Sequence, residues 1–276
     1  MFGELEQSRD KRLMNFLINA FRSLHFRGKA RLLDMAGPNS GIRHARIFGS
    51  VFELDLEDFI QRRIYLGTFE PDETRLLQKH LRPGMTFVDV GANVGYYTAL
   101  AAKQVAGSGG RVIAFEPSPY AFERLQLMVR RNQMEHVTVV HAGLSDVAGQ
   151  SKLYLGIGFH NHSPTMVAHD NTEVTEITVA TLDDEAQRLG IDQIDLMKID
   201  VEGHEPRVLE GAKRLLREGR IRAILCEFND EWLRRAGSDP LHLANTLREV
   251  GFLEADPRRA ALGFENRFFQ LPGSSR

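Results

Sequence analysis

The chain has 276 residues, of which 42% are hydrophobic and 26% are charged, and its formal net charge is −2. This composition is ordinary for a globular protein with a buried core, and the near balance of charges excludes a general attraction to nucleic acid. The single cysteine, Cys226, cannot form an internal disulfide or a zinc site, so we expect a buried, inert thiol in a cytoplasmic protein. No apolar run approaches the ~18 residues that a membrane-spanning helix needs.

The first part of the chain is predicted to be an addition of helix and hairpin over residues 1–68. Residues 5–26 place apolar side chains at intervals of three and four, which predicts an amphipathic helix. Its other face is basic and is either solvated or in contact with an anionic membrane surface or a partner. Residues 36–50 are rich in Gly and Pro and predict a linker or hairpin. Residues 71–81 predict a helix that begins at Pro71.

Residues 69–276 are predicted to form a Rossmann-like α/β domain. Short apolar runs rich in β-branched residues are typical of strands buried on both faces of a parallel sheet. Helical segments between them predict a doubly wound, mostly parallel sheet with helices on both faces. The predicted strands are 86–90, 111–116, 137–142, 194–200 and 222–228, and the predicted helices are 95–106, 119–132 and 206–217.

A β-hairpin insertion is predicted between the third and fourth of these strands. Residues 151–156 and 175–182 alternate like two antiparallel strands. The polar loop that joins them is long and contains His160, Asn161 and His162. Long loops in compact domains are often functional, so we expect residues 158–166 to form a lid or wall over a substrate site.

The turn after the first predicted strand has the features of a nucleoside-binding turn. Gly91 permits a sharp turn, and Gly95 permits close packing of helix and strand. The spacing is Gly-x-Asn-x-Gly, with Asn93 where a dinucleotide fingerprint has the glycine that meets the pyrophosphate. Asp89 adds an anion, which suits a cationic group better than a phosphate.

Glu116 ends the next predicted strand, 21 residues beyond Gly95. An acid at this place can hold both hydroxyls of a ribose. The two features together predict a pocket for a nucleoside with a cationic, phosphate-free tail. S-adenosylmethionine, with its sulfonium and its ammonium, fits that description.

Four blocks of the sequence, in order and at sensible spacing, resemble the FkbM-type methyltransferases, a branch of the Rossmann-like class I S-adenosylmethionine enzymes. They are "DVGANVGYYT", "FEPSPYAFERL", "KIDVEGHEPRVLEGA" and "CEFN", with "GTFEP" upstream. The resemblance implies methyl transfer, mostly to hydroxyl oxygens of sugars, glycans and polyketide-type products. The cofactor residues that it implies are Asp89, Gly91, Asn93 and Gly95 at the methionine part, Glu116 with Pro117 at the ribose, Ser145 and Asp146 at the adenine edge, and Glu70 on the other side.

The acceptor is expected at the end of the predicted strand 194–200, because ligands of open α/β sheets bind at the carboxyl ends of strands. The candidate residues there are Asp200, Glu202, His204 and Glu205, with Lys198 on the same strand face as Asp200. Lys198 is expected to pair with Asp200 or Glu227. The alternative is that this whole group is a structural ion-pair network.

His204 is the first candidate for the general base, since an ordinary histidine pKa near 6.5 leaves the ring mostly neutral at pH 7. Asp200 or Glu202 would then orient it or the acceptor, and His160 and His162 are rival bases. The carboxylates are hard oxygen ligands of the kind that Mg²⁺ accepts, but they belong to one turn and no second acid cluster demands a metal. No metal is therefore expected.

The sequence thus predicts an S-adenosylmethionine-dependent O-methyltransferase acting on a small molecule or glycan with a hydroxyl group. Two alternatives remain: an NAD-type oxidoreductase, against which the Gly-x-Asn-x-Gly spacing argues, and an S-adenosylmethionine-binding module without turnover. No nucleic-acid partner is expected, and a homo-oligomer is left open.

Overall fold

The computed structural model describes Leu33 and residues 37–107, 109–155, 164–168, 173–255 and 264–273. The predicted helix 5–26 and the residues His160, Asn161 and His162 lie outside these ranges. The chain divides into two compact units, one of residues 1–45 and 52–72 and one of residues 46–51 and 73–276. Within the described residues, no helix combines the length and the apolar character needed to cross a membrane.

The hairpin predicted near residues 36–50 is present as β1 (Ile42–Ile47) and β2 (Ser50–Asp55). A helix that the sequence patterns did not predict, α3 (Phe59–Leu66), follows it. Asp58 caps its first turn by accepting a hydrogen bond from the backbone N–H of Gln61, and Gly67 ends it in the left-handed conformation. Both signals are present in the sequence, so this helix could have been predicted from its caps.

The second unit is built on a seven-stranded sheet, which confirms the predicted Rossmann-like α/β fold. The strand order is β11-β12-β10-β9-β3-β4-β5. The strands from β10 to β5 run parallel, while β12 is antiparallel to β10 and β11. Their bounds are Thr86–Val90 (β3), Arg111–Phe115 (β4), Val137–Val140 (β5), Leu196–Ile199 (β9), Ala223–Asn229 (β10), Leu253–Glu254 (β11) and Phe264–Gln270 (β12).

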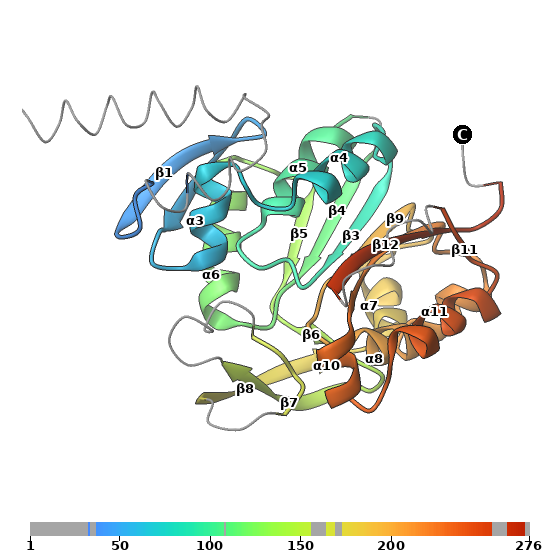
Figure 1. The fold of residues 1–276 in the computed structure, drawn as a ribbon. Helices are drawn as coiled ribbons and strands as arrows, with labels where there is room; N and C mark the ends of the chain where they lie inside the picture. Colours follow the sequence, from blue (N-terminus) through green and yellow to red (C-terminus); the bar gives the residue numbers. More distant parts are fainter. Residues whose placement is uncertain are drawn as a thin grey trace, which may run out of the picture. The chain divides into compact units, whose positions relative to one another are not determined.

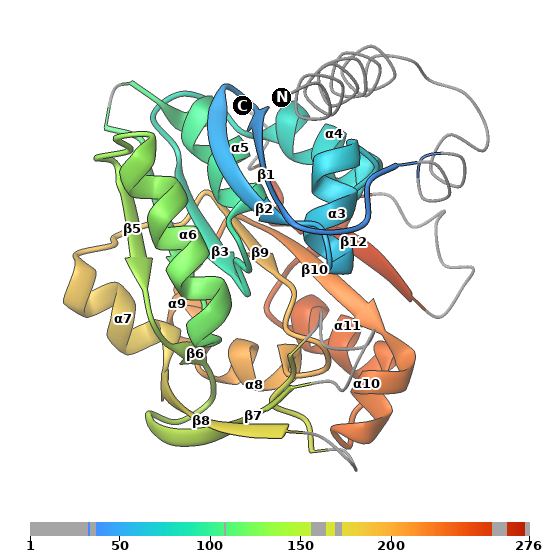
Figure 2. The same ribbon diagram turned by 90° about the vertical axis from the view of Figure 1, so that its left-hand side faces the viewer.

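Helices cover both faces of this sheet, as predicted (Figures 1 and 2). Along β3, Val88 and Val90 enter the apolar core, where they meet residues of the helices on one face, whereas Phe87 and Asp89 point to the opposite face. The helices of the Val88 face are α7 (Leu182–Leu189), α8 (Glu205–Glu210), α9 (Lys213–Arg217), α10 (Asp230–Arg235) and α11 (Pro240–Glu249). The helices of the Asp89 face are α5 (Tyr96–Val105), against β3 and β4, and α6 (Pro119–Arg131), against β5.

The helix predicted over residues 206–217 is in fact two, α8 and α9, separated at Gly211. A Cβ atom added at Gly211 would lie 2.0 Å from the carbonyl oxygen of Ser145. The backbones therefore approach each other more closely than any side chain allows, and the helix is interrupted at this contact.

The insertion between β5 and β9 is a second, three-stranded sheet of order β6-β8-β7. Its strands are β6 (Gly143–Leu144), β7 (Gly149–Leu155) and β8 (Glu173–Ala180), and the antiparallel pairing of β7 with β8 confirms the predicted hairpin. Thr165 bridges to Tyr154 of β7 and donates a 2.7 Å hydrogen bond from its hydroxyl to the carbonyl oxygen of Glu202. Figure 2 shows β3 and β10 pointing toward the side of the large sheet where this small sheet lies.

One backbone contact joins the end of β3 to the end of β9. Gly91 has a φ of +80°, and a Cβ added to it would lie 1.9 Å from the carbonyl oxygen of Asp200. Strands β3 and β9 are parallel neighbours, and the Asp200 N–H donates to the Val90 carbonyl at 3.1 Å. Only glycine fits this position, because it tolerates both the left-handed backbone and the close approach.

We predict that Gly91→Ala destabilises the protein far more than Gly190→Ala. Both glycines are left-handed, with φ +80° and +61°, so alanine carries a backbone cost of about 1–2 kcal/mol at either position. At Gly190 a new Cβ would meet nothing within 4 Å, whereas at Gly91 it would strike a backbone oxygen. Urea unfolding of both variants measures the difference, and equal losses of unfolding free energy would contradict the packing account.

Candidate active site

The turn after β3 adopts an unusual backbone. Gly91, Asn93 and Gly95 all have positive φ angles, of +80°, +50° and +92°. The left-handed conformation is rare for a residue such as asparagine and persists where the surroundings enforce it. The turn is held against β4, because the N–H groups of Gly91 and Ala92 both donate to the Phe115 carbonyl at 3.0 Å. It ends at Gly95, the N-cap of α5.

Glu116 ties the end of β4 to this turn. Its two carboxylate oxygens accept hydrogen bonds from the backbone N–H groups of Asn93, at 2.7 Å, and of Ser118, at 2.8 Å. Burial raises the pKa of Glu116 to about 7, although the two N–H donors oppose the shift. Each oxygen can accept one more hydrogen bond, which matches a pair of ribose hydroxyls.

Asp89 lies beneath the turn and is wholly buried. Its Oδ2 accepts a 2.7 Å hydrogen bond from the Thr98 hydroxyl, and its Oδ1 has no hydrogen-bond partner among the described residues. Burial raises the pKa of Asp89, while the charge of Lys198, its register partner on β9, opposes that shift. A buried acceptor oxygen without a donor, beside a glycine-lined turn, fits a cationic nucleoside tail better than a phosphate.

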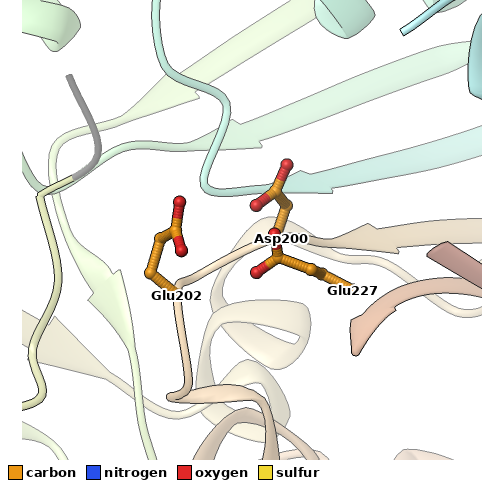
Figure 3. A group of neighbouring side chains, drawn as sticks. All are labelled: Asp200, Glu202 and Glu227. Carbon is orange, nitrogen blue, oxygen red and sulfur yellow. The ribbon is translucent and has the colours of Figure 1, made fainter. Parts of the chain in front are cut away.

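Three carboxylates converge where β9 and β10 end, and we call Asp200, Glu202 and Glu227 the acid cluster (Figure 3). One oxygen of each lies within 4.8 Å of the others. Register explains the meeting, because Ile199 pairs with Cys226 and the next residues along the two parallel strands are Asp200 and Glu227. The sequence pattern indicates Glu227 only as a partner for Lys198, because the register that brings Glu227 to Asp200 is not contained in that pattern.

Lys198 and Glu227 are buried beside this cluster. The Lys198 ammonium donates to Asp200 Oδ2 at 2.6 Å and lies 4.7 Å from the centre of the Tyr97 ring of α5. Of the two predicted partners, Asp200 is thus one that Lys198 contacts by a hydrogen bond. Glu227 is 2% exposed, and burial, followed by the negative charges of Asp200 and Glu202, raises its pKa well above the ordinary value.

His204 lies with another group of residues. Its Nε2 is 3.0 Å from the Ser145 hydroxyl, and that hydroxyl also donates to Asp146 at 2.9 Å. Arg207 donates to the second Asp146 oxygen at 2.5 Å, which helps to lower the pKa of Asp146. The structure thus brings His204 together with the two residues expected at the adenine edge.

The surroundings of His204 shift its pKa away from the ordinary value near 6.5 that was expected for it. Burial, supported by the charge of Arg207 and opposed by that of Asp146, lowers the pKa of His204 to about 4. The imidazole is therefore neutral at pH 7. Any acid limb that it gives to a pH–rate profile falls near pH 4 instead of 6.5.

Two further predicted site residues, Glu205 and Glu70, belong neither to the acid cluster nor to the group around His204. Glu205 is wholly buried, and its Oε1 accepts from the N–H groups of Val201 and Gly203, each at 3.2 Å, so that it holds the turn before α8. Its predicted contact with the acceptor stays a prediction. Glu70 belongs to the first unit, has a φ of +35° and directly precedes α4 (Pro71–His80). Its predicted contact with the cofactor also stays a prediction.

We predict that cofactor affinity depends on the ionisation of Glu116. Its pKa of about 7 applies to the free protein, and ribose hydroxyls donate more strongly to the ionised carboxylate than to the protonated group. Affinity for S-adenosylhomocysteine should therefore fall about tenfold from pH 8 to pH 6. Glu116→Gln should weaken binding at pH 8 by about 1–3 kcal/mol and remove this pH dependence.

Titration calorimetry over this pH range measures both effects. Glu123→Gln, on the exposed side of α6, is the matched control and should behave like the wild type. An unchanged pH dependence in Glu116→Gln would show that another group controls binding.

Comparison with known proteins identifies the class to which this fold and site belong. The family model described as "Methyltransferase FkbM domain" matches residues 89–254, more than half of the chain. The chain therefore belongs to the FkbM methyltransferase family. The matched range contains the glycine turn, Glu116, Ser145 with Asp146, and the acid cluster. Membership in this family makes S-adenosylmethionine the cofactor. The acceptor oxygens of Glu116 and Asp89 fit the ribose hydroxyls and the cationic tail of that molecule.

Two curated proteins are similar to this chain. The 31-O-demethyl-FK506 methyltransferase FkbM of Streptomyces tacrolimicus is 32% identical over 179 residues, covering 54% of this chain and 67% of that protein. The hexuronic acid methyltransferase AglP of Haloferax volcanii is 28% identical over 189 residues, covering 66% of this chain and 69% of that protein. A crystal structure of an FkbM methyltransferase from Methylobacillus flagellatus KT matches with a TM-score of 0.45 and 19% identity, over 76% of this chain and 52% of that one.

Proposed function

We propose that this protein transfers the methyl group of S-adenosylmethionine to a hydroxyl oxygen of a sugar, a glycan or a polyketide-type product. The observation that supports this most directly is the contact between Gly91 and Asp200. It sets the turn expected to hold the methionine part directly against the acid cluster. A methyl group presented by that turn would emerge beside carboxylates that can hold a hydroxyl.

The residues of the second unit divide into three roles in this proposal. Glu116 holds the ribose, Ser145 and Asp146 hold the adenine edge with His204 behind them, and the turn from Asp89 to Gly95 holds the methionine part. S-adenosylmethionine supplies the methyl group when bound, on an activated sulfonium. The protein's task is then to place the acceptor oxygen about 3 Å from the methyl carbon and in line with the sulfur.

The acid cluster would hold the acceptor. Glu202 is half-buried and has a φ of +51°, a backbone conformation that is rare for a residue with a side chain. Its carboxylate lies beside those of Asp200 and Glu227 (Figure 3). The acceptor oxygen bonds to the methyl carbon as the carbon–sulfur bond breaks, and the hydroxyl proton leaves by way of a cluster carboxylate to solvent. The sulfonium charge is lost with the methyl group, which leaves a neutral thioether.

The names of the two relatives support an oxygen-rich acceptor. One name specifies a 31-O-demethyl compound and the other a hexuronic acid, and both are methylated by proteins similar to this one. The loop 158–166 as a wall of the acceptor site, the contact of helix 5–26 with a membrane or partner, a homo-oligomer and a cytoplasmic location remain predictions.

A methyl-transfer assay with labelled S-adenosylmethionine and panels of sugars, glycans and polyketide-type alcohols tests the proposal. Labelled methyl groups should appear in an alkali-stable ether linkage. Stabilisation by NAD but not by S-adenosylhomocysteine would favour the oxidoreductase alternative. Tight cofactor binding without transfer to any hydroxyl compound would favour the binding module without turnover.

We predict that His204→Ala acts mainly on the cofactor. His204 contacts Ser145, so both His204→Ala and Ser145→Ala should weaken S-adenosylhomocysteine binding several-fold, and the double variant should lose little more. The rate at saturating cofactor should fall less than tenfold. A loss of 10²-fold or more in kcat with unchanged cofactor affinity would instead identify His204 as the general base.

A further inference from the structure

The acid cluster has the composition and spread of a cation site. Asp200, Glu202 and Glu227 each contribute a carboxylate oxygen, and these atoms lie within 4.8 Å of one another. In an octahedral Mg²⁺ site with bonds of about 2.1 Å, neighbouring ligand oxygens lie about 3.0 Å apart and opposite ones about 4.2 Å. Side-chain rotations that bring the three oxygens closer by up to about 2 Å would close the cluster onto such an ion.

A second observation, independent of the acidic composition, is that Glu227 is buried and that one of its carboxylate oxygens has no hydrogen-bond partner among the described residues. Its side chain is 2% exposed, and its Oε2 has no hydrogen-bond partner among the described residues. Figure 3 shows this carboxylate extending from β10 toward Asp200. A buried carboxylate oxygen without a donor is costly, and a bound cation removes that cost.

The charged groups around Glu227 also favour a cation. The groups that face it are the carboxylates of Asp200, Glu202 and Glu205 and the ammonium of Lys198. Lys198 is already engaged with Asp200 at 2.6 Å. Three carboxylates and one ammonium therefore surround Glu227, and a divalent cation is attracted to such an excess of acidic groups.

We propose that Asp200, Glu202 and Glu227 bind one divalent cation of the magnesium type. The expectation that no metal binds was drawn from acids of a single turn, Asp200, Glu202 and Glu205. The structure instead holds Glu205 within its own turn and supplies Glu227 from the neighbouring strand. Asp200 and Glu227, near the ends of β9 and β10, and Glu202, in the turn after β9, then provide three hard oxygen ligands. The Asp200 side chain is 22% exposed, so the site is open to further ligands.

The use of such a cation rests on the proposed function. The site lies beside the turn proposed to carry the methyl donor, so a hydroxyl of a sugar or polyketide-type product entering it would bind the cation through oxygen. Coordination makes a hydroxyl more acidic and fixes its position. The hydroxyl proton is then released to water. The acceptor oxygen bonds to the methyl carbon as the carbon–sulfur bond breaks, as it would without the cation.

Binding of Mn²⁺, a paramagnetic substitute for Mg²⁺, tests the site without cofactor or acceptor. Electron paramagnetic resonance should show one bound Mn²⁺ per chain, displaced by excess Mg²⁺. Glu227→Gln should raise the Mn²⁺ Kd at least tenfold, and Glu202→Gln, at a less buried position, should do the same. Glu210→Gln is the matched control, since this exposed residue of α8 pairs with Lys213 outside the cluster.

The outcomes separate this inference from the proposed function. No bound Mn²⁺ at millimolar concentration, or unchanged Mn²⁺ affinity in folded Glu227→Gln and Glu202→Gln, overturns the cation site even if methyl transfer is observed. Site-specific Mn²⁺ binding with no methyl transfer to any hydroxyl acceptor supports the cation site and contradicts the proposed function. Full transfer activity after chelation and dialysis would show that the bound ion is dispensable for the reaction and would overturn its role at the acceptor.

Discussion

The backbone of Gly91 lies against the carbonyl of Asp200, and the arrangement of the whole site depends on this contact. Because β3 and β9 are parallel neighbours at the point where strand order reverses, their carboxyl ends open toward the same space. A glycine without a side chain lets the two ends meet there. The turn proposed to hold the cofactor and the carboxylates proposed to hold the acceptor are consequently adjacent, although more than 100 residues separate Gly91 from Asp200 in the chain.

The face of the sheet that carries α5 is unusually polar at this end. Asp89, Lys198 and Glu227 are all buried on it, whereas their strand neighbours on the opposite face are apolar. Buried charges of this kind cost stability unless they are paired, and Lys198 pairs with Asp200. The carboxylate of Glu116 likewise has a raised pKa, near 7. Buried groups with shifted pKa values gather at sites that act on ligands, and this supports the proposed role of the acid cluster.

The sequence predicted most of the parallel sheet, since its strands are continuous apolar runs. From their spacing it also placed Gly91, Asn93 and Gly95 in one turn and Glu116 at the end of the next strand. It missed β12 because charged residues interrupt that strand; Arg267 lies over the Phe228 ring instead of in solvent. It missed α7, although the Thr181 cap and the glycine at its end were visible. The grouping of His204 with Ser145 and of Glu227 with Asp200 depends on tertiary register, which no local pattern contains.

A crystal structure of the protein with S-adenosylhomocysteine tests the central claim most directly. The claim is that the glycine turn presents the reactive sulfur to the acid cluster. The account predicts both ribose hydroxyls within hydrogen-bonding distance of Glu116, the adenine beside Ser145 and Asp146, and the sulfur on the side of the turn that faces Asp200. A ribose bound away from Glu116, or a sulfur facing away from Asp200, would contradict it.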